Sequence, residues 1–136
     1  MTTDIDDFEL PPYYETLGIE ITDVEPGHAT GRLPLTESMS LSGEETIAHG
    51  GAIVSLADAT GYWAVSAAND RRLTPTIDLR TDFLAPGTDD LHAEAAVVRN
   101  GAATAVADVI VESDAGQVAT VRGVFKTGGS TWNDGD

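Results

Sequence analysis

The sequence contains no cysteine and only one lysine, Lys126, and its 7 basic residues are outnumbered by 23 acidic ones. Without cysteine the chain can form no disulfide bond, no thiolate zinc site and no cysteine nucleophile. A formal net charge of −16 repels phosphate groups, so neither nucleic acid nor an anionic membrane surface is expected as a partner. Dissolved salt screens repulsion among acidic side chains, and this halophilic composition therefore predicts a protein of a salt-rich cytoplasm.

Long apolar segments are also missing. No segment approaches the roughly 18 apolar residues of a membrane span, and the N-terminus, MTTDIDDFEL, lacks the basic and apolar regions of a secretory signal. A chain of 136 residues is long enough for one hydrophobic core. We therefore expect a cytoplasmic protein with a single domain over residues 1–136, with mobile polar tails at 1–9 and 128–136.

Turn residues divide the chain into short segments of strand character and one long helix. The predicted strands cover residues 19–24, 29–35, 76–84, 92–98, 103–113 and 117–127. A helical turn that ends at Gly18 precedes the first strand, and residues 36–48 are predicted to be a loop. Over residues 50–68 apolar side chains follow helical spacing on nearly every side, which predicts a buried helix.

This order of elements predicts an α+β fold in which an antiparallel sheet wraps around one long central helix. Short turns between the late strands favour antiparallel neighbours. Small residues on those strands would let the sheet curl, namely Ala93, Ala95, Ala105 and Ala107. A single wrapped helix leaves a sheet edge and apolar surface open, so pairing of two copies is expected.

The candidate catalytic residues lie in the first half of the predicted helix and in the turn before it. His49, Gly50 and Gly51 open the helix, where free backbone N–H groups and the absence of side chains favour binding of an oxyanion. Asp58 follows about two turns later among apolar neighbours, where an ionised carboxylate is costly unless it lines a cavity or is paired. Asp58 is therefore a candidate base or nucleophile, and the alternative is an ordinary solvated helix acid.

The string HGGAIVSLADATGYW, residues 49–63, resembles the motif of the PaaI-type hotdog-fold acyl-CoA thioesterases, in which an acid follows the histidine by nine positions. The resemblance extends over PTIDLRTDFLAP, residues 75–86, and RNGAATAVADVIVESDAGQVATVRGVFKT, residues 99–127. It implies a hotdog fold and hydrolysis of acyl-CoA or a related acyl thioester, with no cofactor beyond the coenzyme A of the substrate. It also implies a homodimer with shared sites, often doubled to a tetramer.

The resemblance further assigns roles to individual residues. The N–H of Gly50 would polarise the thioester carbonyl, and Asp58 would attack the carbonyl or activate water. The hydroxyl of Thr76, ten positions before Pro86, would assist. The candidate substrate-binding residues are His49, Gly51, Ser55, Arg99 and Arg122.

Two positions depart from the family pattern. The family often has Asn six residues before the histidine, where this chain has Gly43, so the role of that Asn is either taken by another group or absent. Many members carry a basic residue in the turn before the penultimate strand, where coenzyme A phosphates dock. Here that turn, residues 100–103, is Asn-Gly-Ala-Ala, and the basic residues nearby are Arg99, Arg122 and Lys126.

Several alternatives stay open from the sequence. His49 is expected to cap the glycine turn rather than to act in catalysis, and without Cys or a second His in register no metal site is predicted. Ser55 lies one turn before Asp58 and either bonds that carboxylate or packs as a small residue. Tyr62 and Trp63 belong in the core or line an acyl pocket. A hotdog hydratase or dehydratase, which would use His49, and a non-catalytic acyl-thioester-binding domain are the competing functions.

Overall fold

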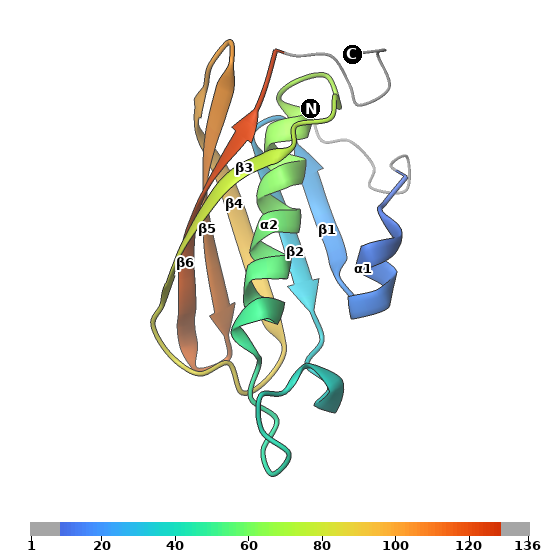
Figure 1. Ribbon diagram of the computed structural model, residues 1–136, viewed down its shortest axis with the longest axis vertical. Coiled ribbons are helices and arrows are strands. Elements are labelled where there is room, and N and C mark those ends of the chain that lie inside the picture. Colours follow the sequence, from blue (N-terminus) through green and yellow to red (C-terminus); the bar gives the residue numbers. More distant parts are fainter. Residues whose placement is uncertain (1–8, 129–136) are drawn as a thin grey trace.

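The computed structural model describes residues 9–128, which form six strands and two α-helices (Figure 1). The elements are α1 Pro12–Leu17, β1 Glu20–Glu25, β2 His28–Leu33, the 3-10 turn η2 Glu37–Met39, α2 Gly50–Ala67, β3 Thr76–Phe83, β4 Leu91–Asn100, β5 Thr104–Ser113 and β6 Gly116–Lys126. These bounds agree with the predicted ranges to within two residues, and the predicted loop over 36–48 contains η2. The predicted mobile tails, apart from Glu9 and Gly128, lie outside the described residues.

The sheet packs against one face of α2 and curls around it, which confirms the predicted α+β class and hotdog arrangement (Figure 1). The four alanines expected to permit this curl are at most 4% exposed: Ala93, Ala95, Ala105 and Ala107. Register shifts in four of the five strand pairs add local twist, because a bulge bends the strand that carries it. Among the described residues no helix has the length and hydropathy to cross a membrane.

All strand pairs are antiparallel, in the order β1-β2-β4-β5-β6-β3. The expectation that short connections join neighbouring strands is wrong for β3 and β4, because β3 pairs with β6 at the far edge. The connection over 84–90 crosses three interstrand spacings, about 14 Å, which seven extended residues span easily. Two hydrogen bonds hold it below α2, from Ala48 N to Gly87 O at 2.8 Å and from Leu84 N to Val118 O at 2.8 Å.

The ends of α2 follow from local contacts. At its start the side chain of His49 caps the helix, because Nδ1 accepts a hydrogen bond from the Gly51 N–H at 3.0 Å. At its end Asp70 and Arg71 have positive φ angles of 57° and 60°, which the helix cannot continue through. The Asn69 side chain then donates to the Val65 carbonyl at 2.8 Å and covers the last turn.

Candidate active site

One side of α2 faces away from the sheet and carries four residues at helical spacing. Gly51, Ser55, Asp58 and Tyr62 follow one another at intervals of four, three and four positions, which places them along a single stripe. Most other residues of α2 are buried against the sheet. This stripe is therefore where the central helix can meet a ligand.

Asp58 lies in the middle of this stripe and is half-buried. The hydroxyl of Thr76, the first residue of β3, donates a hydrogen bond to Asp58 Oδ1 at 2.6 Å. Burial raises the pKa of the Asp58 carboxyl above its ordinary value, and the Thr76 hydrogen bond works against this rise. The structure thus brings together two of the three predicted catalytic residues, Asp58 and Thr76.

A pocket of about 220 Å³ opens beside Asp58. Its lining, which we call the Asp58 pocket, consists of Pro11, Tyr13, Tyr14, Ser55, Asp58, Ala59, Tyr62, Leu73 and Thr76. All three tyrosines of the chain are among these residues. Burial raises the pKa of the Tyr14 and Tyr62 hydroxyls, so both stay neutral donors beside the carboxylate. The pocket is therefore an aromatic and apolar cavity with one ionisable acid.

The glycine turn lies at the other end of the stripe. The N–H groups of Gly51, Ala52 and Ile53 are used within the turn, whereas none of the hydrogen bonds among the described residues uses the Gly50 N–H. A Cβ at position 50 would lie 3.2 Å from the Phe83 ring, so only glycine fits there without displacing that ring. His49 acts as the cap that the sequence predicts, and its Nδ1 is occupied by Gly51.

Gly50 and Asp58 of one chain do not face the same point. They are eight residues apart on one helix, which corresponds to about 12 Å along its axis. A single thioester carbonyl would contact the Gly50 N–H through its oxygen and Asp58 through its carbon. With each contact about 3 Å long, the two protein groups would have to lie within about 7 Å of each other. One chain therefore presents the predicted oxyanion donor and the predicted base to two different places.

Ser55 neither makes a hydrogen bond to Asp58 nor packs against the sheet, so both alternatives left open by the sequence are wrong. Its Oγ shares a hydrogen bond of 2.8 Å with the hydroxyl of Tyr13 on α1. On the far side of this contact lies a second pocket of about 260 Å³, the His49 pocket, lined by Tyr13, Leu17, Ser38, Met39, Ser40, His49, Gly51, Ala52 and Ser55. Ser55 thus lies between two pockets along α2.

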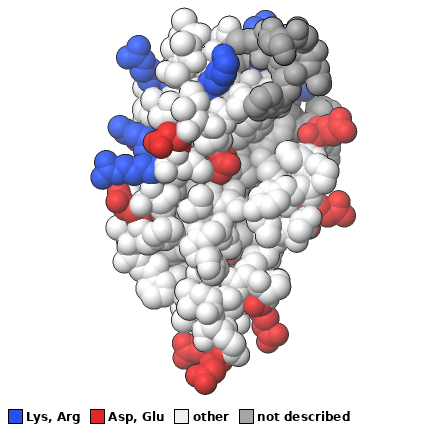
Figure 2. Space-filling view, viewed as in Figure 1, with Lys and Arg blue, Asp and Glu red and all other residues white. Residues whose placement is uncertain are grey.

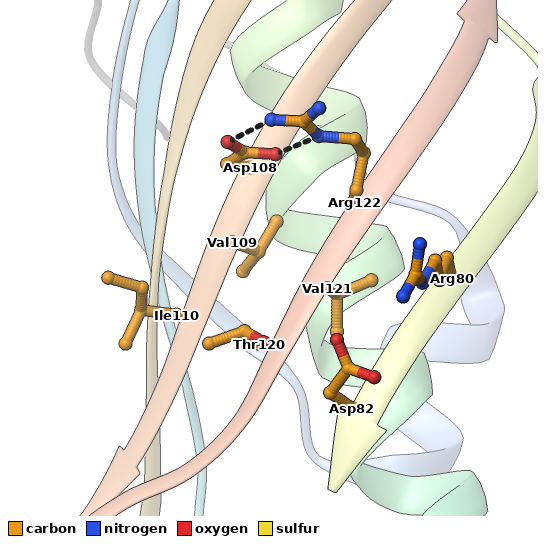
Figure 3. Close-up of a pocket in the computed structure, with 8 residues that line it drawn as sticks. All are labelled: Arg80, Asp82, Asp108, Val109, Ile110, Thr120, Val121 and Arg122. Carbon is orange, nitrogen blue, oxygen red and sulfur yellow. Dashed lines mark hydrogen bonds and ion pairs between the residues drawn. The ribbon is translucent and has the colours of Figure 1, made fainter.

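The two predicted arginines lie elsewhere. Arg122 is on the outer face of the sheet, where its guanidinium makes two hydrogen bonds to Asp108 at 2.7 and 2.8 Å, with α2 behind the strands (Figure 3). This follows from strand alternation, since its neighbours Val121 and Gly123 point inward. Arg99 precedes Asn100, whose side chain meets Asn69 at the C-terminal end of α2. The structure brings neither arginine together with Asp58 in this chain.

Some residues of the Asp58 pocket were not predicted from the sequence. Tyr13 and Tyr14 appear there only as part of a short helix, and Leu73 follows the charged end of α2 without any motif. No spacing rule links α1 to α2, because their contact depends on how β1 and β2 return the chain. In residues 9–128 no group of three or more His, Cys, Asp and Glu side chains is placed to share a metal ion.

Comparison with known proteins identifies related sequences. The model of the thioesterase superfamily matches residues 45–120, a range that includes α2 and extends into β6. A protein of Halobacterium salinarum, whose name proposes that it is an esterase, is 33% identical over 121 residues. That match covers 81% of this chain and 80% of the other protein.

Solved structures share the fold over most of the chain. The E. coli PaaI protein from the phenylacetic acid degradation operon superimposes with a TM-score of 0.79 at 30% identity, covering 89% of this chain and 87% of that one. The conserved protein PA5202 of Pseudomonas aeruginosa gives a TM-score of 0.80 at 26% identity, with coverage of 86% and 94%. The arrangement of α2 inside a six-stranded sheet is therefore common to these proteins.

Proposed function

The chain belongs to the thioesterase superfamily, and on that premise we propose that it hydrolyses acyl thioesters, with acyl-coenzyme A as the substrate class. The observation that carries this proposal is the Asp58 carboxylate, half-buried in a largely apolar pocket, raised in pKa by burial and held by Thr76 at 2.6 Å. A carboxylate with a raised pKa is a stronger base than a solvated aspartate, which suits proton abstraction from water. The pocket beside it would take the acyl group.

In the proposed reaction a water oxygen forms a bond to the carbonyl carbon while Asp58 accepts the proton. The resulting oxyanion collapses, the carbon–sulfur bond breaks, and the thiolate takes up a proton. A thiolate leaves readily, so no strong general acid is required, which suits a pocket with one ionisable acid. In the covalent variant Asp58 itself attacks, and water then hydrolyses the anhydride.

The proposed site needs two copies of the chain. Because Gly50 and Asp58 are about 12 Å apart on one helix, the oxyanion donor for each Asp58 would come from Gly50 of a second protomer. The edge strand β3 supports such pairing, since its outer side has no strand partner and large apolar side chains are exposed there. These side chains are Ile77, Phe83 and Leu84, each at least 55% exposed. We propose a homodimer built on this edge, and a tetramer would pair two such dimers.

The test is a hydrolysis screen of short, long and aryl acyl-CoAs in high salt, with D58N beside the wild-type chain. We expect the wild type to release thiol and D58N to lose at least about 100-fold in kcat, the usual contribution of a positioned base. The matched control D114N makes the same chemical change in an exposed turn, and it should keep wild-type activity. Full activity in D58N would exclude a catalytic role for Asp58. Tight binding of acyl-CoA by the wild type without release of thiol would favour the alternative of a non-catalytic binding domain.

Thermal unfolding separates lost chemistry from lost folding. When the pKa of a carboxyl is higher in the folded state, that carboxyl stabilises the fold at pH values below its unfolded-state pKa of 3.8. This contribution to stability is lost as the pH rises through the folded-state pKa. D58N has no side chain to ionise at this position and avoids the cost of burying a charge, so its Tm at pH 7 should equal or exceed that of the wild type. A single turnover in heavy-oxygen water then separates the two mechanisms. General-base catalysis places the label in the released acid and none in Asp58, whereas attack of water on the Asp58 carbonyl carbon of the anhydride places the label in Asp58 and releases an unlabelled acid.

A further inference from the structure

The two pockets along α2 are separated by one side-chain contact. Within residues 9–128, Tyr13 and Ser55 alone line both the Asp58 pocket and the His49 pocket. Their hydroxyls meet at 2.8 Å, so the Tyr13 side chain crosses the exposed stripe of α2 from α1. In Figure 1 α1 lies next to the start of β1, at the height of the N-terminal half of α2, which carries Ser55.

The His49 pocket contains the kind of surface that a hydrocarbon chain needs. Leu17 and Met39 are partly buried hydrophobic residues packed against the core, and Ala52 is buried. Its polar residues, Ser38, Ser40 and His49, carry no ionised carboxylate. An acyl chain extended from the Asp58 pocket would therefore find apolar contacts beyond Tyr13 if that side chain were absent.

The position of Tyr13 allows it to act as a wall without being part of the core. Its side chain is 54% exposed, whereas its neighbour Tyr14 is 7% exposed and packs inside. Pro11 and Pro12 precede it, and their fixed φ angles limit how far the start of α1 can swing. The tyrosine ring is thus held in place by the proline pair on one side and by Ser55 on the other.

From this geometry we infer that Tyr13, held by Ser55, is a specificity-determining residue that confines the acyl group to the Asp58 pocket and excludes long chains from the His49 pocket. The inference rests on the proposed hydrolysis of acyl thioesters and deepens it by naming the substrate class as short acyl groups. Tyr13 acts by shape, since the proposed proton transfer is left to Asp58.

The test measures kcat/KM for a series of straight-chain acyl-CoAs from acetyl to dodecanoyl. In the wild type, kcat/KM should fall once the chain outgrows the Asp58 pocket. Y13A joins the two pockets, and the ratio of kcat/KM for decanoyl-CoA to that for butanoyl-CoA should rise at least about tenfold, the effect of one or more newly buried methylenes. V98A, which truncates a side chain that is also 54% exposed but lies on β4, should leave this ratio unchanged.

Y13F and S55A keep the inference testable if Y13A does not fold, because each removes the same hydrogen bond from one side and leaves the tyrosine-sized ring in place. Both should raise the ratio by a similar factor that is smaller than that of Y13A, and the double variant should add nothing further. An unchanged ratio in all variants of an active enzyme overturns the role of Tyr13 alone. A wild type that hydrolyses no acyl-CoA overturns the proposed function together with it.

Discussion

At the scale of single residues, the hydrogen bond from Thr76 governs how readily Asp58 ionises. A hydrogen bond donated to a carboxylate favours its charged form, and here it opposes the rise in pKa that burial causes. In T76V the pKa of Asp58 should therefore rise further. Since the proposed hydrolysis needs the ionised form, the midpoint of kcat/KM against pH should move to higher pH.

The loss of activity in T76V should thus be largest at acidic pH, about tenfold, and should shrink at alkaline pH, where Asp58 ionises in both proteins. T76S retains a hydroxyl and should keep the wild-type midpoint. A uniform loss at all pH values would mean that Thr76 contacts the substrate instead of tuning Asp58. The profile is measured with a single acyl-CoA across the range in which the fold is stable.

The sequence predicts Asp58 and Thr76 but not the cavity around them. In the sequence, Asp58 stands out because an ionised acid among apolar residues is energetically costly. In the structure it is half-buried beside a pocket and accepts one hydrogen bond, from Thr76. The contact of Tyr13 with Ser55 spans 42 positions and depends on tertiary packing, which periodicity cannot show. The positions of Arg99 and Arg122 could not be predicted for a different reason: the place of a residue along a strand does not by itself say which face of the sheet its side chain takes.

At the scale of elements, β2 approaches α2 closely enough to require a glycine. A Cβ at Gly31 would lie 2.5 Å from Thr60 Oγ1 and 3.3 Å from Leu56 Cδ1. Thr60 cannot easily turn away, because its hydroxyl donates to the Leu56 carbonyl at 2.8 Å inside the helix. G31A should therefore separate β2 from α2 and lower the free energy of unfolding by about 1–3 kcal/mol.

Denaturant unfolding provides the measurement, with G43A as the matched control. A Cβ at Gly43 would meet nothing within 4 Å, so the same change should be close to neutral there. Because the stripe with Asp58 is on the side of α2 away from β2, activity per folded molecule should be retained in G31A. Equal stability of the two variants would contradict the close packing seen here.

Element type and extent could be predicted because each segment carries its own signal. Turn residues mark the strands, and the unbroken apolar pattern over 50–68 marks α2. The order of the strands could not be predicted in this way. Whether β3 pairs with β4 or with β6 depends on contacts between segments far apart in the sequence. The chain resolves it by placing the connection over 84–90 beneath α2, through backbone hydrogen bonds that no side-chain pattern encodes.

At the scale of the whole molecule, one face can be described by where its charges lie. On the face drawn in Figure 2 the basic side chains lie in the upper part, mostly on the left and with acidic side chains among them, while other acidic side chains lie at the right edge and the lower end. With a net charge of −16, repulsion among the acids opposes the compact state until salt screens it. The Tm should rise by about 5 °C or more between 0.1 and 2 M KCl.

A matched variant isolates charge from other effects of salt. Replacing Glu44 and Glu45, two exposed neighbours in the loop before α2, by lysine changes the net charge from −16 to −12. The double variant should be more stable than the wild type in dilute buffer and should gain less from added KCl. Identical salt dependence in both proteins would indicate that screening is not the cause.

If each site is shared between two protomers, as proposed, two inactive variants should restore activity when they are mixed. D58N lacks the base but keeps the Gly50 N–H, whereas G50P lacks that N–H but keeps the base, and proline is tolerated at the first helical position. In the proposed dimer, a mixed pair would have one site that combines Asp58 of one chain with Gly50 of the other. Because half of the dimers are mixed and each has one intact site, activity should return to about a quarter of the wild-type value.

G50A controls for the volume added at this position, because it keeps the N–H but places a Cβ 3.2 Å from the Phe83 ring. Its activity should therefore exceed that of G50P. Sedimentation before and after mixing checks that the chains exchange and whether dimers or tetramers form. If exchange is complete and no activity returns, each site lies within one chain, and the distance of about 12 Å between Gly50 and Asp58 then rules out Gly50 as the oxyanion donor.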